Sequence, residues 1–217
     1  MSTDEMAAVP AADEEDAAWI SMDLPLPLEE LFASLQNTER LFRLNPYLEI
    51  VSWRDEVPGR IAPGKRFRVE TANELNGLHQ TRTLIVDELV PGKGYTLRYD
   101  SGLKQSTVIS AQALTPSSSR LVVKDCYPTH LSPAQREARL SEVDKTLAPW
   151  GDAIRRYYVS RKFWGWLPFH SGFQDGFWLK MPPRQRRTAR LIVWVSLLEF
   201  VVFLFVFFIY WLELGRT

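Results

Sequence analysis

The chain has 217 residues, 46% of them hydrophobic, and its 26 basic residues balance 26 acidic ones. Its single cysteine, Cys126, excludes an internal disulfide and agrees with a reducing compartment. The three histidines, His79, His130 and His170, are scattered, so none lies at the spacing of a metal site or a catalytic triad. We therefore expect no metal and no cofactor.

Residues 1–16 are rich in Ala, Asp and Glu and show no hydrophobic periodicity. This composition predicts a disordered acidic tail. The first 18 residues also lack the apolar core of a signal peptide.

The segment 17–24 follows with the alternation of a strand, since Ile20, Met22 and Leu24 share one side. The spacing of Leu28, Leu31, Phe32 and Leu35 predicts a short amphipathic helix, and a second short helix is expected from Thr38 to the Asn45-Pro46 break.

Residues 47–127 show repeated alternation of apolar and polar residues, separated by turn signals. Pro63-Gly64, Asn76-Gly77, Pro91-Gly92 and Ser101-Gly102 mark turns between short strands. Close, regular turns favour an antiparallel meander of about six strands.

The pattern changes at Ser132-Pro133, which is typical of a helix start. From there Leu147, Trp150, Ile154 and Tyr157 repeat at helical spacing, and the opposite face is charged. The segment is therefore predicted to form one long amphipathic helix.

This order of elements resembles the START-like or SRPBCC superfamily, which includes polyketide cyclases and lipid-transport proteins. The resemblance is carried by WISMDLPLPLEELFASLQNTERLFRLNP, PGKRFRVET, DELVPGKGYTLRYD, SSRLVVKDCY and the final long helix. It covers residues 17–160 and implies an α+β helix-grip domain, in which an antiparallel sheet wraps a long C-terminal helix. It also implies a cavity between the sheet and that helix.

The cavity would be lined by inward strand residues and one helix face, which gives a mostly apolar set of candidate ligand-binding residues. These candidates are Phe67, Val69, Leu97, Tyr99, Val108, Trp150 and Ile154. The alternative is that they pack together as an ordinary core. Arg68, Glu70, Arg82 and Asp125 would point inward only if a strand were out of phase by one residue. No catalytic residue can be assigned.

Residues 161–190 combine many aromatic side chains with glycines, prolines and cations. Tryptophan favours the membrane interface and a basic segment beside a membrane is attracted to anionic headgroups, so we expect this segment to lie on the bilayer surface. The residues expected there are Trp164, Trp166, Trp178, Arg184, Arg186, Arg187 and Arg190. The alternative is a loop whose aromatic side chains pack on the domain.

The stretch 191–212 is almost wholly apolar, and its 22 residues would extend about 33 Å as a helix, enough to cross a bilayer core. Four arginines precede it and one, Arg216, follows, which predicts a single-pass protein with a cytoplasmic N-terminal domain. Nucleic-acid binding competes as an explanation of these arginines, but their place beside the apolar stretch accounts for them, so no nucleic acid is expected.

Glu199 is the acidic residue inside this stretch, and a charge at that depth is costly. It would be protonated, drawn toward the headgroups, or paired with another membrane subunit.

Together these features favour a membrane-anchored protein that binds or transfers a hydrophobic ligand such as a lipid, quinone or polycyclic compound. Two alternatives stay open: a cyclase or dehydratase acting on a lipid-soluble substrate, and an accessory or assembly subunit of a membrane complex.

Overall fold

The computed structural model describes residues 17–75, 77–128 and 132–214. The predicted acidic tail, His130 and Asn76 lie outside the described residues. The helices are α1 (Leu28–Leu35), α2 (Thr38–Arg43), α3 (Pro133–Trp164), α4 (His170–Gly176) and α5 (Pro183–Leu214), with a short 3₁₀ helix η1 (Trp178–Lys180) between the last two. The strands are β1 (Ala17–Leu24), β2 (Leu48–Asp55), β3 (Arg66–Asn73), β4 (His79–Val90), β5 (Gly94–Tyr99), β6 (Ser106–Thr115) and β7 (Ser118–Cys126).

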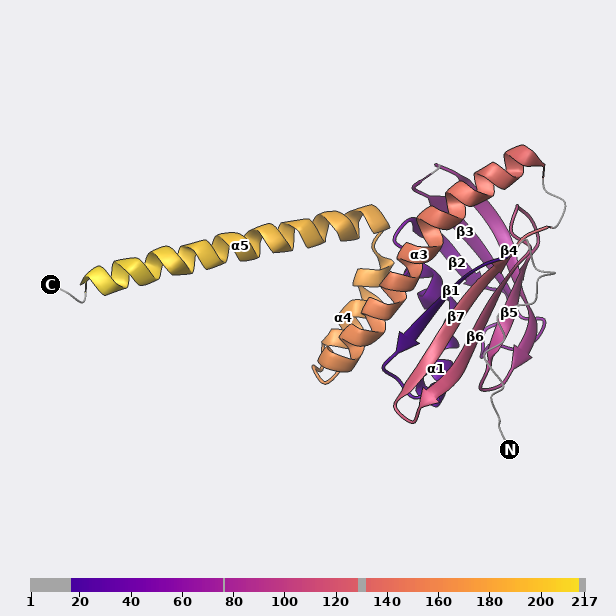
Figure 1. Cartoon of the computed structure of the whole chain (residues 1–217), viewed down its shortest axis with the longest axis horizontal. Helices are drawn as coiled ribbons and strands as arrows, with labels where there is room; N and C mark the ends of the chain where they lie inside the picture. The colour runs from indigo at the N-terminus through magenta and orange to yellow at the C-terminus, as the bar shows by residue number, and fades with distance from the viewer. Residues whose placement is uncertain (1–16, 76, 129–131, 215–217) are drawn as a thin grey trace, which may run out of the picture.

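All seven strands form one antiparallel sheet in the order β1-β7-β6-β5-β4-β3-β2. Register shifts interrupt β2 between Ile50 and Ser52, β4 between Val86 and Glu88, and β6 near Ala113. Bulges of this kind increase local twist and bend the strands, which lets the sheet curl around α3 (Figure 1). The structure thus confirms the predicted α+β helix-grip fold, including the opening strand, the two short helices and the long α3.

Helix α3 is held against the sheet and the short helices by buried aromatic and aliphatic side chains. Trp150 is 4% exposed and donates from its indole Nε1 to the backbone oxygen of Leu41 at 2.9 Å. Gly151 lies so close to β1 that a Cβ there would come within 2.2 Å of Ile20 Cδ1. A small residue at this point allows the helix to approach the strand.

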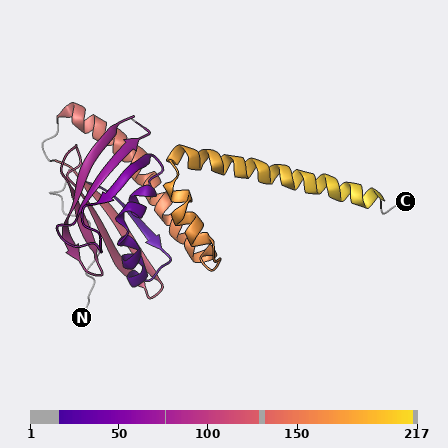
Figure 2. The same ribbon diagram turned by 180° about the vertical axis from the view of Figure 1, so that it is seen from behind.

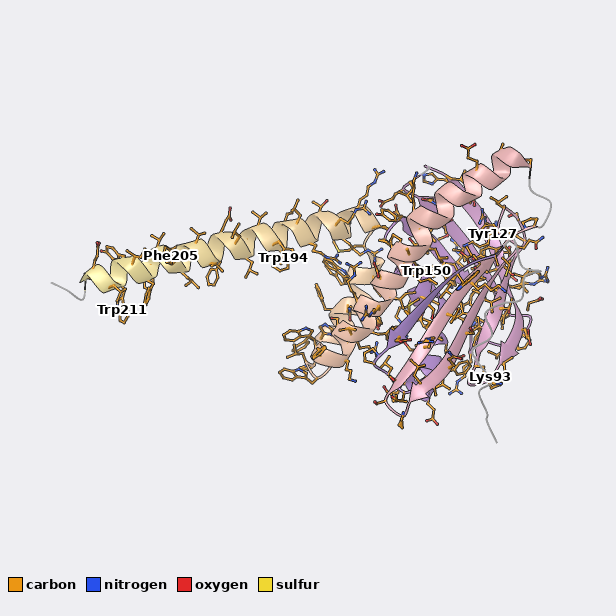
Figure 3. The ribbon with its side chains drawn as sticks, viewed as in Figure 1. Lys93, Tyr127, Trp150, Trp194, Phe205 and Trp211 are labelled. Carbon is orange, nitrogen blue, oxygen red and sulfur yellow. The ribbon has the colours of Figure 1, made fainter. Side chains whose placement is uncertain are left out.

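Helix α5 extends away from the sheet, as both opposite views show (Figures 1 and 2). It is long and apolar enough to cross a membrane, and residues 191–214 are all exposed. The side chains of Trp194, Phe205 and Trp211 lie along this projecting part (Figure 3). The end of α3 and helix α4 project on the same side of the sheet as α5 (Figures 1 and 2).

Candidate ligand-binding cavity

A cavity of about 100 Å³ lies between the concave face of the sheet and α3. Its wall contains apolar side chains, including Phe42, Leu48, Val69, Leu84 and Leu103. It also contains polar side chains, including Thr71, Gln80, Arg82, Tyr99, Lys104 and Tyr127. The two kinds alternate along the wall, since Val69 pairs with Arg82 and Leu84 with Tyr99 in the sheet. A cavity of roughly 150 Å³ can hold benzene, so this space is smaller than the one a six-membered ring needs. Pockets for drug-sized ligands measure about 300–1,000 Å³, so a larger ligand requires the cavity to widen.

Two polar side chains of the wall, Tyr99 and Lys104, are connected to Asp125, which lies behind the wall and is 4% exposed. Its carboxylate accepts a hydrogen bond from the Thr107 hydroxyl at 2.6 Å and pairs with the Lys104 ammonium at 2.5 Å. The Tyr99 hydroxyl lies 2.9 Å from Thr107 Oγ1. Four side chains from β5, β6, β7 and the β5–β6 loop therefore form one connected polar cluster, which we call the Asp125 cluster.

Burial and charge decide the protonation of this cluster. Burial raises the pKa of the Tyr99 hydroxyl. Burial alone would lower the pKa of Lys104, but the Asp125 carboxylate and the hydroxyls of Tyr99 and Tyr127 outweigh it, so the pKa is raised. At neutral pH Lys104 is therefore charged and Tyr99 is protonated. The Thr107 hydroxyl donates its proton to Asp125, so the Tyr99 hydroxyl donates to Thr107 Oγ1 and turns its lone pairs to the cavity, while Lys104 keeps N–H donors for a ligand.

Arg82 adds a second cation to this end of the cavity. Its guanidinium carbon lies 5.9 Å from the centre of the Tyr99 ring, and Lys104 Nζ lies 5.8 Å from the same ring. The guanidinium also passes directly over Gly102, where a Cβ would come within 2.4 Å of it and where φ is +102°. Glycine at this turn leaves the space in which Arg82 lies.

Among the seven predicted ligand-binding residues, Val69 and Tyr99 line the cavity. Four others are buried in the core around it, at 0–4% exposure: Phe67, Leu97, Trp150 and Ile154. Phe67 and Trp150 belong to a row of aromatic rings with Trp53 and Phe42, at centroid distances of 5.3–5.7 Å. They therefore support the wall of the cavity through Phe42.

The prediction for Val108 was wrong. Thr107 and Ile109 are both 0% exposed and pair with the inward residues Leu97 and Tyr95, whereas Val108 pairs with Thr96 and Lys124 on the outer face. The error is one residue in the phase of β6, which moves a side chain to the opposite face of a sheet.

Sequence reasoning missed Lys104 and assigned Arg82 and Asp125 to the outer face. The same period-2 rule would have found Asp125, because Leu121, Val123 and Asp125 alternate in β7 and the first two are 0% exposed. Lys104 lies in the loop before β6, where periodicity gives no signal. Among the residues that the structure describes, no group of three or more His, Cys, Asp or Glu could hold a metal ion.

The aromatic residues between α3 and α5 divide into two groups. Trp164 and Trp166 are 53% and 75% exposed, as are neighbouring phenylalanines, at the tip formed by the end of α3 and the start of α4. Trp178 instead is partly buried and packs against the hydrophobic core. Contact of this segment with a bilayer stays a prediction.

The arginines before the apolar stretch attach the start of α5 to the domain. Glu74, at the end of β3, accepts a hydrogen bond from the backbone nitrogen of Arg184 at 2.9 Å and pairs with the guanidinium of Arg187. Arg187 also donates to the backbone oxygen of Pro46 at 2.7 Å, and Arg186 reaches that of Asn45 at 3.4 Å. Arg190 is exposed, as is Glu199 further along the helix, whose pairing with another subunit stays a prediction.

Solved structures share this fold. A protein from Nitrosomonas europaea aligns with a TM-score of 0.53 and 15% identity, over 68% of this chain and 97% of that chain. A Thermobifida fusca structure aligns with a TM-score of 0.50 and 12% identity, over 65% and 92%. A START superfamily protein from Mycobacterium smegmatis aligns with a TM-score of 0.46 and 16% identity, over 66% and 97%. No protein-family model and no curated protein matches the chain. The first two likenesses show that this fold occurs in solved structures, and they leave the ligand open.

Proposed function

We propose that the protein is a membrane-anchored binding protein that takes a hydrophobic ligand into its helix-grip cavity, for transfer or presentation at the bilayer. The single observation that carries this proposal is the mixed lining of the cavity, in which apolar side chains such as Val69 and Leu84 lie beside the polar side chains of Arg82, Lys104 and Tyr99. Such a wall fits an amphiphilic molecule.

The donors in the wall define the group of the ligand that they bind. Charged Arg82 and Lys104 suit carbonyl, hydroxyl or acidic oxygens, and the Tyr99 hydroxyl, which donates to Thr107, can accept from a ligand hydroxyl. At about 100 Å³ the cavity must widen to take a ring. A lipid that carries an oxygen-substituted ring, such as a quinone, offers acceptors to these donors, with its ring in the widened cavity and its chain reaching out of it.

The cyclase or dehydratase alternative gains one observation, the buried Asp125 cluster. However, both carboxylate oxygens of Asp125 are already used, one by Thr107 and one by Lys104. A carboxylate held in this way stabilises the lysine and positions the hydroxyl. We therefore assign the cluster to ligand recognition.

The test is lipid extraction and mass spectrometry of the full chain, purified gently from membranes, with an α5-only peptide as the control for bulk lipid. Val69→Trp places a large side chain in the cavity, and Arg68→Trp places the same side chain on the outer face one residue away. We expect one lipid class near one molecule per chain in the wild type and in Arg68→Trp, and its loss in Val69→Trp. Equal lipid content in all three proteins would refute the proposal.

A further inference from the structure

A second pocket, of about 250 Å³, lies where α3, η1 and the start of α5 meet. We call it the arginine pocket. Among the residues that the structure describes, its lining contains no acidic side chain. The lining includes four arginines, Arg156, Arg186, Arg187 and Arg190, together with the apolar side chains of Leu44, Trp178 and Leu179.

The hydrogen bonds of these arginines leave capacity for an anion. Arg187 is paired with Glu74, and Arg156 donates from Nε to the backbone oxygen of Asp152 at 3.2 Å. Arg186 Nε is buried and has no hydrogen-bond partner within the described part of the chain. A buried N–H without an acceptor is costly, so an acceptor in the pocket would stabilise this arrangement.

The position of the pocket indicates where such an anion would come from. Arg190 immediately precedes the exposed apolar part of α5, and the aromatic tip with Trp164 and Trp166 projects on the same side of the sheet (Figures 1 and 2). If residues 191–212 cross the bilayer, Arg190 and the pocket lie at the level of the lipid headgroups.

We propose that the arginine pocket binds the phosphate of an anionic phospholipid in the leaflet that faces the domain. Guanidinium groups match phosphate oxygens in planar, paired hydrogen bonds, and basic pockets beside transmembrane helices are suited to anionic headgroups. Trp178 and Leu179 provide an apolar wall for the glycerol and upper acyl region. This site rests on the membrane anchoring proposed above and is independent of what the helix-grip cavity binds.

Native mass spectrometry of the full chain in mild detergent tests the site, with dioleoyl phosphatidylglycerol and dioleoyl phosphatidylcholine titrated separately. We expect one phosphatidylglycerol per chain, at least about tenfold stronger than phosphatidylcholine. The double variant Arg186→Gln and Arg190→Gln should weaken phosphatidylglycerol binding by about tenfold or more. The double variant Arg66→Gln and Arg68→Gln removes the same charge from exposed positions on β3 and should leave binding unchanged. Arg190→Gln alone repeats the test at an exposed position, where the substitution should leave the fold intact.

Three results would overturn the proposal: equal binding of the two lipids, unchanged binding in both arginine-pocket variants, or stoichiometric displacement of the lipid by inorganic phosphate, which would assign the pocket to a soluble anion. Val69→Trp should keep the phosphatidylglycerol. A failure of the cavity proposal is therefore distinguishable from a failure of this one.

Discussion

Replacing Asp125 by alanine tests the polar cluster directly, because it leaves two donors without their shared acceptor. The side chain of Lys104 is 21% exposed and that of Asp125 is 5% exposed. Breaking a fully buried pair costs about 3–5 kcal/mol, and partial exposure of Lys104 reduces this to about 2 kcal/mol. The Thr107 hydroxyl, 0% exposed, loses its carboxylate acceptor, which adds about 1 kcal/mol.

A loss of about 3 kcal/mol lowers the melting temperature of a domain of this size by roughly 6–12 °C. The measurement is thermal unfolding of the full chain in mild detergent, followed by intrinsic fluorescence at one scan rate. The matched control is Asp87→Ala, because Asp87 pairs with Arg98 on the exposed outer surface at 3.4 Å and its loss should cost less than about 1 kcal/mol.

The double variant Lys104→Met and Asp125→Leu separates the cost of an unpaired ammonium from the cost of changing side chains at this position. Replacing both charges by apolar side chains of similar size removes the unpaired ammonium, so we expect most of the lost stability to return. If Asp125→Ala melted at the same temperature as Asp87→Ala, Asp125 would not lie in the interior as described, and the reasoning about β7 would be refuted.

Three further perturbations test the attachment of α5, the tyrosine on α3 and the phase of β6. Glu74→Gln should loosen the first turn of α5 by about 1 kcal/mol, seen as faster amide hydrogen exchange in residues 184–188, whereas the exposed Glu70→Gln should not. Equal exchange in the two variants would contradict the Glu74 contact. Burial raises the pKa of Tyr157 to about 12; the charge of Arg40 opposes this shift and Asp175 adds to it. The protonated Tyr157 hydroxyl therefore stabilises the fold fully below the unfolded pKa of 10.0, and this stabilisation is lost as pH rises toward 12. The melting temperature should therefore fall less steeply between pH 9 and 11.5 in Tyr157→Phe than in the wild type or Tyr47→Phe. Identical slopes would argue against a raised pKa of Tyr157. Ile109→Asp should unfold the domain, at a cost of about 3 kcal/mol or more, while Val108→Asp should fold normally, and the reverse order would show that the phase of β6 is wrong.

Local sequence patterns were enough to predict the elements and their order. The alternation in 17–24 and the spacing of Leu28, Leu31 and Leu35 arise from burial on one face, so the same rule that folds the segment reveals it. Close turns then leave an antiparallel meander as the arrangement of the strands.

The polar wall of the cavity was harder to predict because its parts are distant in sequence. Asp125 and Lys104 meet only through the register of β5, β6 and β7, and a one-residue error in β6 exchanged Val108 for its inward neighbours. Similarly, the arginines before the apolar stretch were expected to face a bilayer, but the contact of Arg187 with Glu74 depends on where the end of β3 lies.

Crosslinking from leucine positions shows whether a hydrophobic ligand occupies the helix-grip cavity. Photo-leucine is close to leucine in size and can be incorporated throughout the full chain in cells, after which crosslinked peptides are located by mass spectrometry. Three leucines that line the cavity and are not exposed report on it: Leu48, Leu84 and Leu103. Leu78 also lines it but is 47% exposed, so it does not separate cavity from surface.

Leu75 and Leu114 are exposed on the domain, and the leucines of α5 report contact with bulk lipid. We expect one small hydrophobic molecule attached at Leu48, Leu84 or Leu103 and absent from Leu75 and Leu114. Crosslinks to lipid confined to α5 would contradict it.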